Sequence, residues 1–241
     1  MHAVVIICKK ELRSFFDSLF AYILLALFIG ITGFFTWMSD SDIFHVGQTS
    51  LHGFYSVAYW SVFFFTAALT IRMLTEERKT KADELSSTKS ASSMQIVLGK
   101  FFGALTLVAI ALLFTLPYVF TLAYLGNLDQ GEVMGGYLAL LLMAGAYISI
   151  GLLASSMTSN QVLSFLLAIT MSLFFHIIFE VLAAKITGLP SDLVTYLTMS
   201  AHFESMVRGI LDTRDILYFL TIICIGLILT ELYLTKRNIL N

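Results

Sequence analysis

Six long apolar segments dominate this chain of 241 residues. A helix needs about 20 mostly apolar residues to cross a hydrocarbon core about 30 Å thick, because it rises about 1.5 Å per residue. The segments that meet this requirement cover residues 19–38, 55–74, 96–125, 136–157, 162–184 and 216–234. We therefore predict an all-α polytopic membrane protein, with six transmembrane helices in a single domain covering residues 1–241.

The composition supports a lipid-embedded chain and argues against other classes. Charged residues make up 12% of the sequence, whereas soluble domains contain roughly 25%. The net charge of -2 is not that of a nucleic-acid binder, which would present a basic face. Only two cysteines occur, Cys8 and Cys224, so neither a disulfide framework nor a cysteine metal site is indicated.

The residues before the first span form an amphipathic pattern. On a helical wheel, one arc of residues 1–18 is apolar, and the opposite side carries Lys9, Lys10 and Arg13. This pattern predicts an N-terminal interfacial helix whose lysines face anionic headgroups. A plain helical extension of the first span is the alternative. We expect the first span to be a retained anchor, because residues 37–40 offer no small-residue cleavage pattern.

Lysine and arginine residues are concentrated on one side of the predicted membrane. Eleven of the 14 lie before the first span, around the link between the second and third spans, or after the last span. The connections at residues 39–54 and 126–135 carry none. The positive-inside rule therefore places both termini in the cytoplasm, as an even number of spans also requires.

The most polar stretch of the chain separates the second and third spans. Residues 76–89 contain eight charges in 14 positions. We interpret residues 75–95 as a cytoplasmic coupling segment that docks a partner, with a solvated loop as the alternative. The candidate coupling residues are Glu76, Glu77, Arg78, Lys79, Glu84 and Leu85.

Ionisable residues inside the spans are few, and each is costly unless it faces protein or water. His176 and Glu180 lie four residues apart in the fifth span, which places them on one helix face. They are candidates for an intramembrane polar site, with snorkelling or an interhelical hydrogen bond as the alternative. Pro117 is expected to kink the third span. Small residues in the fourth span, such as Gly145 and Gly151, should permit close helix packing.

The connection before the last span, residues 185–214, carries a candidate extracytoplasmic motif. Met199, Phe203, Met206 and Ile210 recur at helical spacing. This spacing predicts an amphipathic helix on or in the outer leaflet, or else an ordinary surface helix. The two arginines here breach the positive-inside trend, so we expect them to pair with nearby acidic side chains. The motif residues are His202, Phe203, Glu204, Arg208, Gly209, Asp212 and Arg214.

Motifs of intrinsic catalysis are absent from the sequence. A phosphate-binding loop of the form G-x-x-x-x-G-K-[ST] would need a glycine five residues before Gly99-Lys100 and a Ser or Thr after it, and neither is present. A nucleophile elbow, an H-E-x-x-H pair and a Cys/His cluster are also absent. We expect a chain that is not an enzyme and that holds no cofactor or metal of its own.

The residue order around the coupling segment is informative as well. It runs Glu76-Glu77-Arg78-Lys79, then Glu84-Leu85, then Ile96-Val97-Leu98-Gly99-Lys100-Phe101. This order resembles the cytoplasmic link of ABC-2 type permeases, in which a short helix couples the membrane subunit to its ATPase. A Gly-Thr pair and a proline of that family are replaced here by Lys81-Ala82 and Ser90. The resemblance implies a permease subunit whose separate ATP-binding partner holds ATP and Mg²⁺.

A second similarity lies in residues 202–220, before and within the last span. Together with the amphipathic start, the turn at residues 154–161 and the C-terminal Lys-Arg, this segment resembles the gliding-motility permease GldF and its relatives. The resemblance implies one ABC-2 type transmembrane domain in a bacterial inner membrane. Its implied partners are an ATP-binding subunit and an auxiliary membrane protein called GldG, a second permease copy, or both.

Three functions remain open on this reading of the sequence. The first is a permease subunit that couples ATP hydrolysis on its partner to transport, or to gliding-motility or secretion-related work. The second is an ion-coupled secondary carrier, which would show inverted repeats or midplane charges that are not clear here. The third is a membrane scaffold of a motility machine that transports nothing.

Overall fold

The computed structural model describes residues 2–38, 50–84, 92–185, 194 and 196–240. Within these residues, six helices are long and apolar enough to cross a membrane. They are Leu19–Trp37, His52–Thr75, Ser93–Leu125, Gln130–Met157, Gln161–Leu182 and Thr213–Lys236. The all-α prediction and the six spans are confirmed. The fourth span begins at Gln130, earlier than the predicted residue 136. The Asp129 side chain caps this helix by accepting a hydrogen bond from Gly131 N–H at 2.8 Å.

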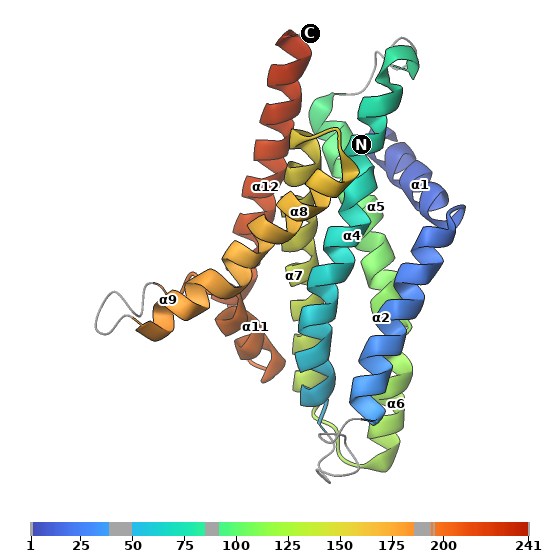
Figure 1. The fold of residues 1–241 in the computed structure, drawn as a ribbon. Helices are drawn as coiled ribbons and strands as arrows, with labels where there is room; N and C mark the ends of the chain where they lie inside the picture. Colours follow the sequence, from blue (N-terminus) through green and yellow to red (C-terminus); the bar gives the residue numbers. More distant parts are fainter. Residues whose placement is uncertain (1, 39–49, 85–91, 186–193, 195, 241) are drawn as a thin grey trace.

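Figure 1 shows the order and placement of the helices. In chain order they are α1 (His2–Phe16), α2 (Leu19–Trp37), α4 (His52–Glu84), α5 (Ser93–Leu113), α6 (Leu116–Leu125), α7 (Gln130–Met157), α8 (Gln161–Leu173), the π-helical turn η1 (Phe174–Ile178), α9 (Phe179–Lys185), α11 (Met199–Val207) and α12 (Thr213–Leu240). The free ends of α1 and α12 and the last turns of α4 lie at one end of the bundle, here named the terminal end. The starts of α4 and α7 lie at the opposite end, named the distal end.

The central helix of the bundle is α7, which contacts α4, α5, α8, α11 and α12. Its small residues allow these close approaches. A Cβ added at Gly145 would meet the Ile223 side chain of α12 at 2.9 Å, and one at Gly151 would collide with the Thr70 side chain of α4. The predicted close packing of the fourth span is therefore confirmed.

The third span is divided into α5 and α6 around Thr115. Pro117 stands in the first turn of α6, where its missing N–H costs least. The Thr115 hydroxyl donates to the Leu112 carbonyl at 2.7 Å and lies 2.9 Å from the Tyr137 hydroxyl of α7. The predicted kink of this span is confirmed as a division into two helices, and Thr115 makes local polar contacts at the division.

The amphipathic N-terminal segment forms a separate helix, α1, and not an extension of the first span. The break lies at Ser18, whose hydroxyl accepts from Phe20 N–H at 3.2 Å and caps α2. One side of α1 packs against α5, where a Cβ added at Gly99 would meet the side chain of Ile7 at 2.6 Å. A buried ion pair joins the two helices, because Lys100 Nζ lies 2.7 Å from Glu11 Oε1.

The ion pair between α1 and α5 is expected to hold α1 in place. Glu11→Gln leaves the Lys100 ammonium group, whose side chain is 2% exposed, buried without this carboxylate. We expect the free energy of unfolding to fall by about 2 kcal/mol, because a charge-assisted hydrogen bond is lost, and hydrogen exchange over residues 2–16 to accelerate. Lys9→Ala, at an exposed position of the same helix, is the control and should change neither. Equal exchange in the two variants would contradict this role.

Candidate functional site: a polar pocket at the distal end

The predicted coupling residues extend the second span beyond its apolar part. The backbone of Glu76, Glu77, Arg78, Lys79 and Glu84 continues α4 as one helix of 33 residues. Leu85 and the rest of the connection to residue 91 lie outside the described residues. Figure 1 shows this extension projecting at the terminal end, beside the free ends of α1 and α12. The coupling segment thus begins as a helical projection of α4.

A pocket of about 350 Å³ opens between α4, α9 and α11. It brings together residues from both candidate sites predicted from the sequence: Glu180 of the fifth span, and Phe203, Glu204 and Arg208 of the extracytoplasmic motif. The remaining lining residues are His52, Tyr55, Ser56, Tyr59, Trp60, Ser200 and Val207. The pocket therefore joins two sets of residues that lie more than 20 positions apart in the sequence.

Aromatic rings form one wall of the pocket, and His176 supports them from behind. The His176 ring stacks on Tyr59 at 4.3 Å between centroids and meets Trp60 edge to face at 4.4 Å. Its Nδ1 atom forms a hydrogen bond with the Tyr147 hydroxyl of α7. His176 belongs to η1, and π-helical turns of this kind often occur at functional sites. The predicted pair is thus split, with His176 buried behind Tyr59 and Glu180 on the pocket surface.

The charged groups at the pocket are unevenly paired. Arg208 Nη2 lies 3.4 Å from Glu204 Oε2, one turn away on α11, and both side chains are mostly exposed. This pair confirms that Arg208 is matched by an acidic neighbour, although its contribution to stability is small. Glu180 accepts one hydrogen bond, from the Ser200 hydroxyl at 3.1 Å. Within the described part of the chain, no three His, Cys, Asp or Glu side chains gather closely enough to hold a metal ion.

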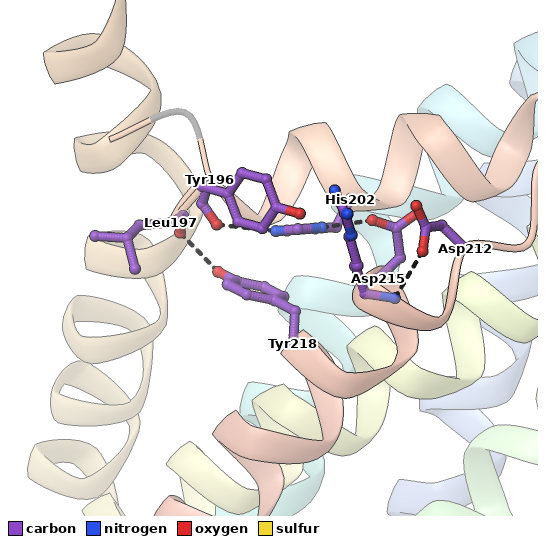
Figure 2. Close-up of polar contacts among 7 residues, drawn as sticks. Tyr196, Leu197, His202, Asp212, Asp215 and Tyr218 are labelled. Carbon is purple, nitrogen blue, oxygen red and sulfur yellow. Dashed lines mark hydrogen bonds and ion pairs between the residues drawn. The ribbon is translucent and has the colours of Figure 1, made fainter. Parts of the chain in front are cut away.

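The motif beside the pocket is held by a buried contact between His202 and Asp215 (Figure 2). His202 Nδ1 lies 2.6 Å from Asp215 Oδ1, and Nε2 lies 2.9 Å from the Tyr196 carbonyl oxygen. Because a carbonyl oxygen only accepts, Nε2 carries a proton. A second proton must lie between Nδ1 and Oδ1, since two lone pairs would otherwise face each other. The pair is therefore neutral overall, either as imidazolium with carboxylate or as imidazole with carboxylic acid.

The other motif residues shape the turn from α11 into α12. Tyr218 stacks on the His202 ring at 4.1 Å, and its hydroxyl donates to the Leu197 carbonyl at 2.7 Å. Asp212 Oδ1 accepts from Arg214 N–H at 2.9 Å at the start of α12, while the Arg214 side chain is exposed. Gly209 has φ +80°, which L side chains rarely adopt, and its Cα packs against the start of α7.

The amphipathic helix of this connection faces protein. Met199, Phe203 and Met206 are buried, and α11 packs against α7. Ile210 was predicted on the same face but is 61% exposed, because α11 ends at Val207 and the chain turns. The arrangement is that of a surface helix docked on the bundle, the second of the two predicted alternatives.

A larger cavity of about 680 Å³ lies between α2 and α4. Its walls are almost wholly apolar, formed by residues such as Leu24, Phe28, Ile31 and Phe64, and Trp60 lines both cavities. The polar side-chain groups among its lining residues are two serine hydroxyls and the indole N–H of Trp60. The pocket between α4, α9 and α11 is therefore the stronger candidate for recognising a polar ligand.

Sequence reasoning missed several residues of this site. Tyr59 and Trp60 were read only as part of an apolar span, and Asp215 and Tyr218 were not selected as motif residues. A charged residue in the first turn of the last span was the available signal for Asp215, because a charge at a membrane-helix end needs a partner or water. No local pattern marks Tyr59 or Trp60, since their role depends on which helices meet.

Removing the imidazole of the motif is expected to cost more than neutralising its partner. His202→Ala leaves the Asp215 carboxyl group, which is 6% exposed, buried without its donor, so the free energy of unfolding should fall by about 3 kcal/mol. Asp215→Asn still presents an N–H to Nδ1 and should cost about 1 kcal/mol. Thermal unfolding in one detergent measures both. Arg208→Ala removes only the exposed pair and is the control; a loss equal to that of His202→Ala would refute the structural role of the buried pair.

Comparison with known proteins agrees with this architecture. The sequence matches the family described as "ABC-2 family transporter protein" over residues 5–235. The match covers α1, all six spans and the residues that line the pocket. No curated protein shows a significant match to the chain. The chain belongs to the ABC-2 transporter family, and it is a multi-pass membrane protein of the permease type.

Proposed function

We propose that this chain couples ATP hydrolysis on a separate nucleotide-binding subunit to movement of its helix bundle. The observation that carries this proposal is the unbroken course of α4 from the pocket to the charged residues 76–84. ATP and Mg²⁺ bind to the partner, because the sequence of this chain lacks a phosphate-binding loop. Membership of the ABC-2 family also supports a membrane permease chain that works with a separate ATP-binding subunit.

The proposed site of ATPase docking is the terminal end of the bundle. In the proposed orientation this end faces the cytoplasm of a bacterium, with the chain spanning the inner membrane and both termini inside. The Lys and Arg distribution supports this orientation. It is also supported by Figure 1, in which the free ends of α1 and α12 and the projection of α4 lie together. A docking subunit would thus meet three helices at once.

The proposed complex contains a further membrane component, either a GldG-like auxiliary protein or a second copy of this permease. The resemblance of residues 202–220 to the GldF group supports the first partner and a role in gliding-motility or secretion-related work. The outward faces of α2 and α8 are rich in exposed apolar side chains, among them Leu27, Ile31, Leu163 and Leu166. Such faces suit either lipid or a neighbouring membrane helix.

Docking of the ATPase is expected to depend on the charges of the α4 projection. Glu76→Lys with Glu77→Lys reverses two of them and should abolish copurification of the nucleotide-binding subunit from native cells, because complementary charges fix the register of such contacts. The matched control is Arg208→Glu with Arg214→Glu, which reverses two exposed charges at the distal end, away from the proposed docking surface. Mass spectrometry of the purified complex and vanadate-sensitive ATP turnover are the measurements.

Two results would contradict the proposal. If the variant at Glu76 and Glu77 copurifies with as much of the nucleotide-binding subunit as the unaltered chain does, the projection of α4 is not the docking site. If the unaltered chain purifies alone and without ATP turnover, the secondary carrier or the scaffold becomes the better account. ATP turnover that rises when a transported substrate is added would separate a transporter from a scaffold.

A further inference from the structure

We propose that the pocket between α4, α9 and α11 binds the ammonium group of an organic cation. Three features point to this chemistry: aromatic walls, one carboxylate without a cationic partner among the described residues, and a buried hydroxyl that has no hydrogen-bond partner there. The inference goes beyond the proposed function and does not depend on it, because binding can be measured on this chain alone.

The aromatic walls are rigid and close together. Tyr59 is held between His176, at 4.3 Å, and Phe203, at 4.9 Å between ring centroids. The indole ring of Trp60 also packs against His176. Trp60 nevertheless remains 44% exposed. Ring faces that are exposed at a pocket attract cations through their quadrupole, and tryptophan does so most strongly. Because His176 and Phe203 cover the two faces of the Tyr59 ring, the partly exposed indole of Trp60 is the ring that favours a compact positive group over a neutral one.

The charge balance favours a cation as well. Arg208 and Glu204 offset each other within one turn of α11. Glu180, in contrast, accepts a hydrogen bond from the Ser200 hydroxyl and forms no ion pair among the described residues. The pocket lining therefore carries one negative charge in excess. An anion in the pocket would be repelled by the Glu180 carboxylate, whereas an ammonium group would form an ion pair with it.

The third feature is the Tyr59 hydroxyl. Tyr59 lines the pocket with 9% of its surface exposed, and its hydroxyl has no hydrogen-bond partner of good geometry. Ser200 is close enough to influence it, but the two hydroxyls do not have the geometry of a hydrogen bond. Buried hydroxyls are rarely left unsatisfied, because the loss of hydration is costly. A polar group of a ligand in the pocket would satisfy this one.

Two sources could supply the same ammonium chemistry. A phospholipid such as phosphatidylethanolamine carries it on a headgroup, and the pocket lies at the distal end of the bundle, beside the exposed apolar residues of α9 such as Val181. A free amine or quaternary ammonium compound carries it in solution. The experiment below uses one soluble probe and two lipid compositions to separate these sources.

Trp60 provides the reporter. The chain contains two tryptophans, Trp37 and Trp60, so Trp37→Phe leaves a single indole in the pocket wall. The full chain in lipid nanodiscs is titrated with choline, with sodium chloride at matched ionic strength. The neutral isostere 3,3-dimethyl-1-butanol has the same shape without the charge. We expect choline to shift the Trp60 emission saturably, and the isostere to bind more weakly.

Glu180→Gln tests the charge in the same single-tryptophan background. It should weaken choline binding by about tenfold, because a charge-assisted contact is lost. The matched control is Glu231→Gln, the same change in the part of α12 near the terminal end. It should leave binding unchanged. Glu180 is exposed, so the substitution should leave the fold intact, which the emission without ligand verifies. No saturable shift, equal binding of choline and its isostere, or full affinity in Glu180→Gln would overturn the proposal.

Lipid composition identifies the source. If phosphatidylethanolamine nanodiscs raise the choline concentration needed for half saturation, relative to nanodiscs of an uncharged glycolipid, the headgroup competes for the pocket. If the two compositions give equal titration curves, the pocket takes its cation from solution. Both results support the ammonium site, and they assign it to different ligands.

Discussion

Close packing against α7 is the constraint on which the rest of the bundle depends. Helices in lipid gain little from apolar burial alone, so they associate through van der Waals contact and interhelical hydrogen bonds. The α7 helix offers both to α4: Gly151 gives space to Thr70, and the Ser155 hydroxyl accepts from Leu74 N–H at 3.2 Å. Since α4 carries both Tyr59 and the proposed coupling residues, the fit at Gly151 helps to position the helix that connects the pocket to the terminal end.

Two buried contacts between ionisable groups fasten the helices that lie outside the six spans. Glu11 and Lys100 join α1 to α5, and His202 and Asp215 join α11 to α12. Ionisable groups removed from water are tolerated only when they are paired, so each contact specifies one position for its helix. The second contact matters for the pocket because α11 supplies Phe203 and Arg208 to its lining. The candidate extracytoplasmic motif thus has a structural role, because its buried His202 positions the neighbouring residues that line the pocket.

Hydropathy predicted the spans well because the bilayer imposes a length on each of them. Local patterns also located the separate α1, the break at Pro117 and the small residues of α7. The pocket could not be predicted in this way, since Glu180 and Phe203 meet only through the packing of α9 and α11 on α4. Periodicity failed at Ile210 for a related reason. A helical pattern continues through Gly209 in the sequence, whereas the positive φ there ends the helix.

The course of α4 makes the two ends of the molecule mechanically dependent on each other. Its 33 residues span about 50 Å as one helix, and within them there is no proline and only one glycine, Gly53, in the first turn. Sharp kinks need such residues or a π turn, so α4 runs from Tyr59 and Trp60 to Glu84 without one. The fifth span, in contrast, contains the π turn η1 around His176. Two rings of α4, Tyr59 and Trp60, pack on this turn and also line the pocket between α4, α9 and α11. A movement of α4 would therefore change the pocket, and the proposed coupling of a ligand at one end to an ATPase at the other requires such a link.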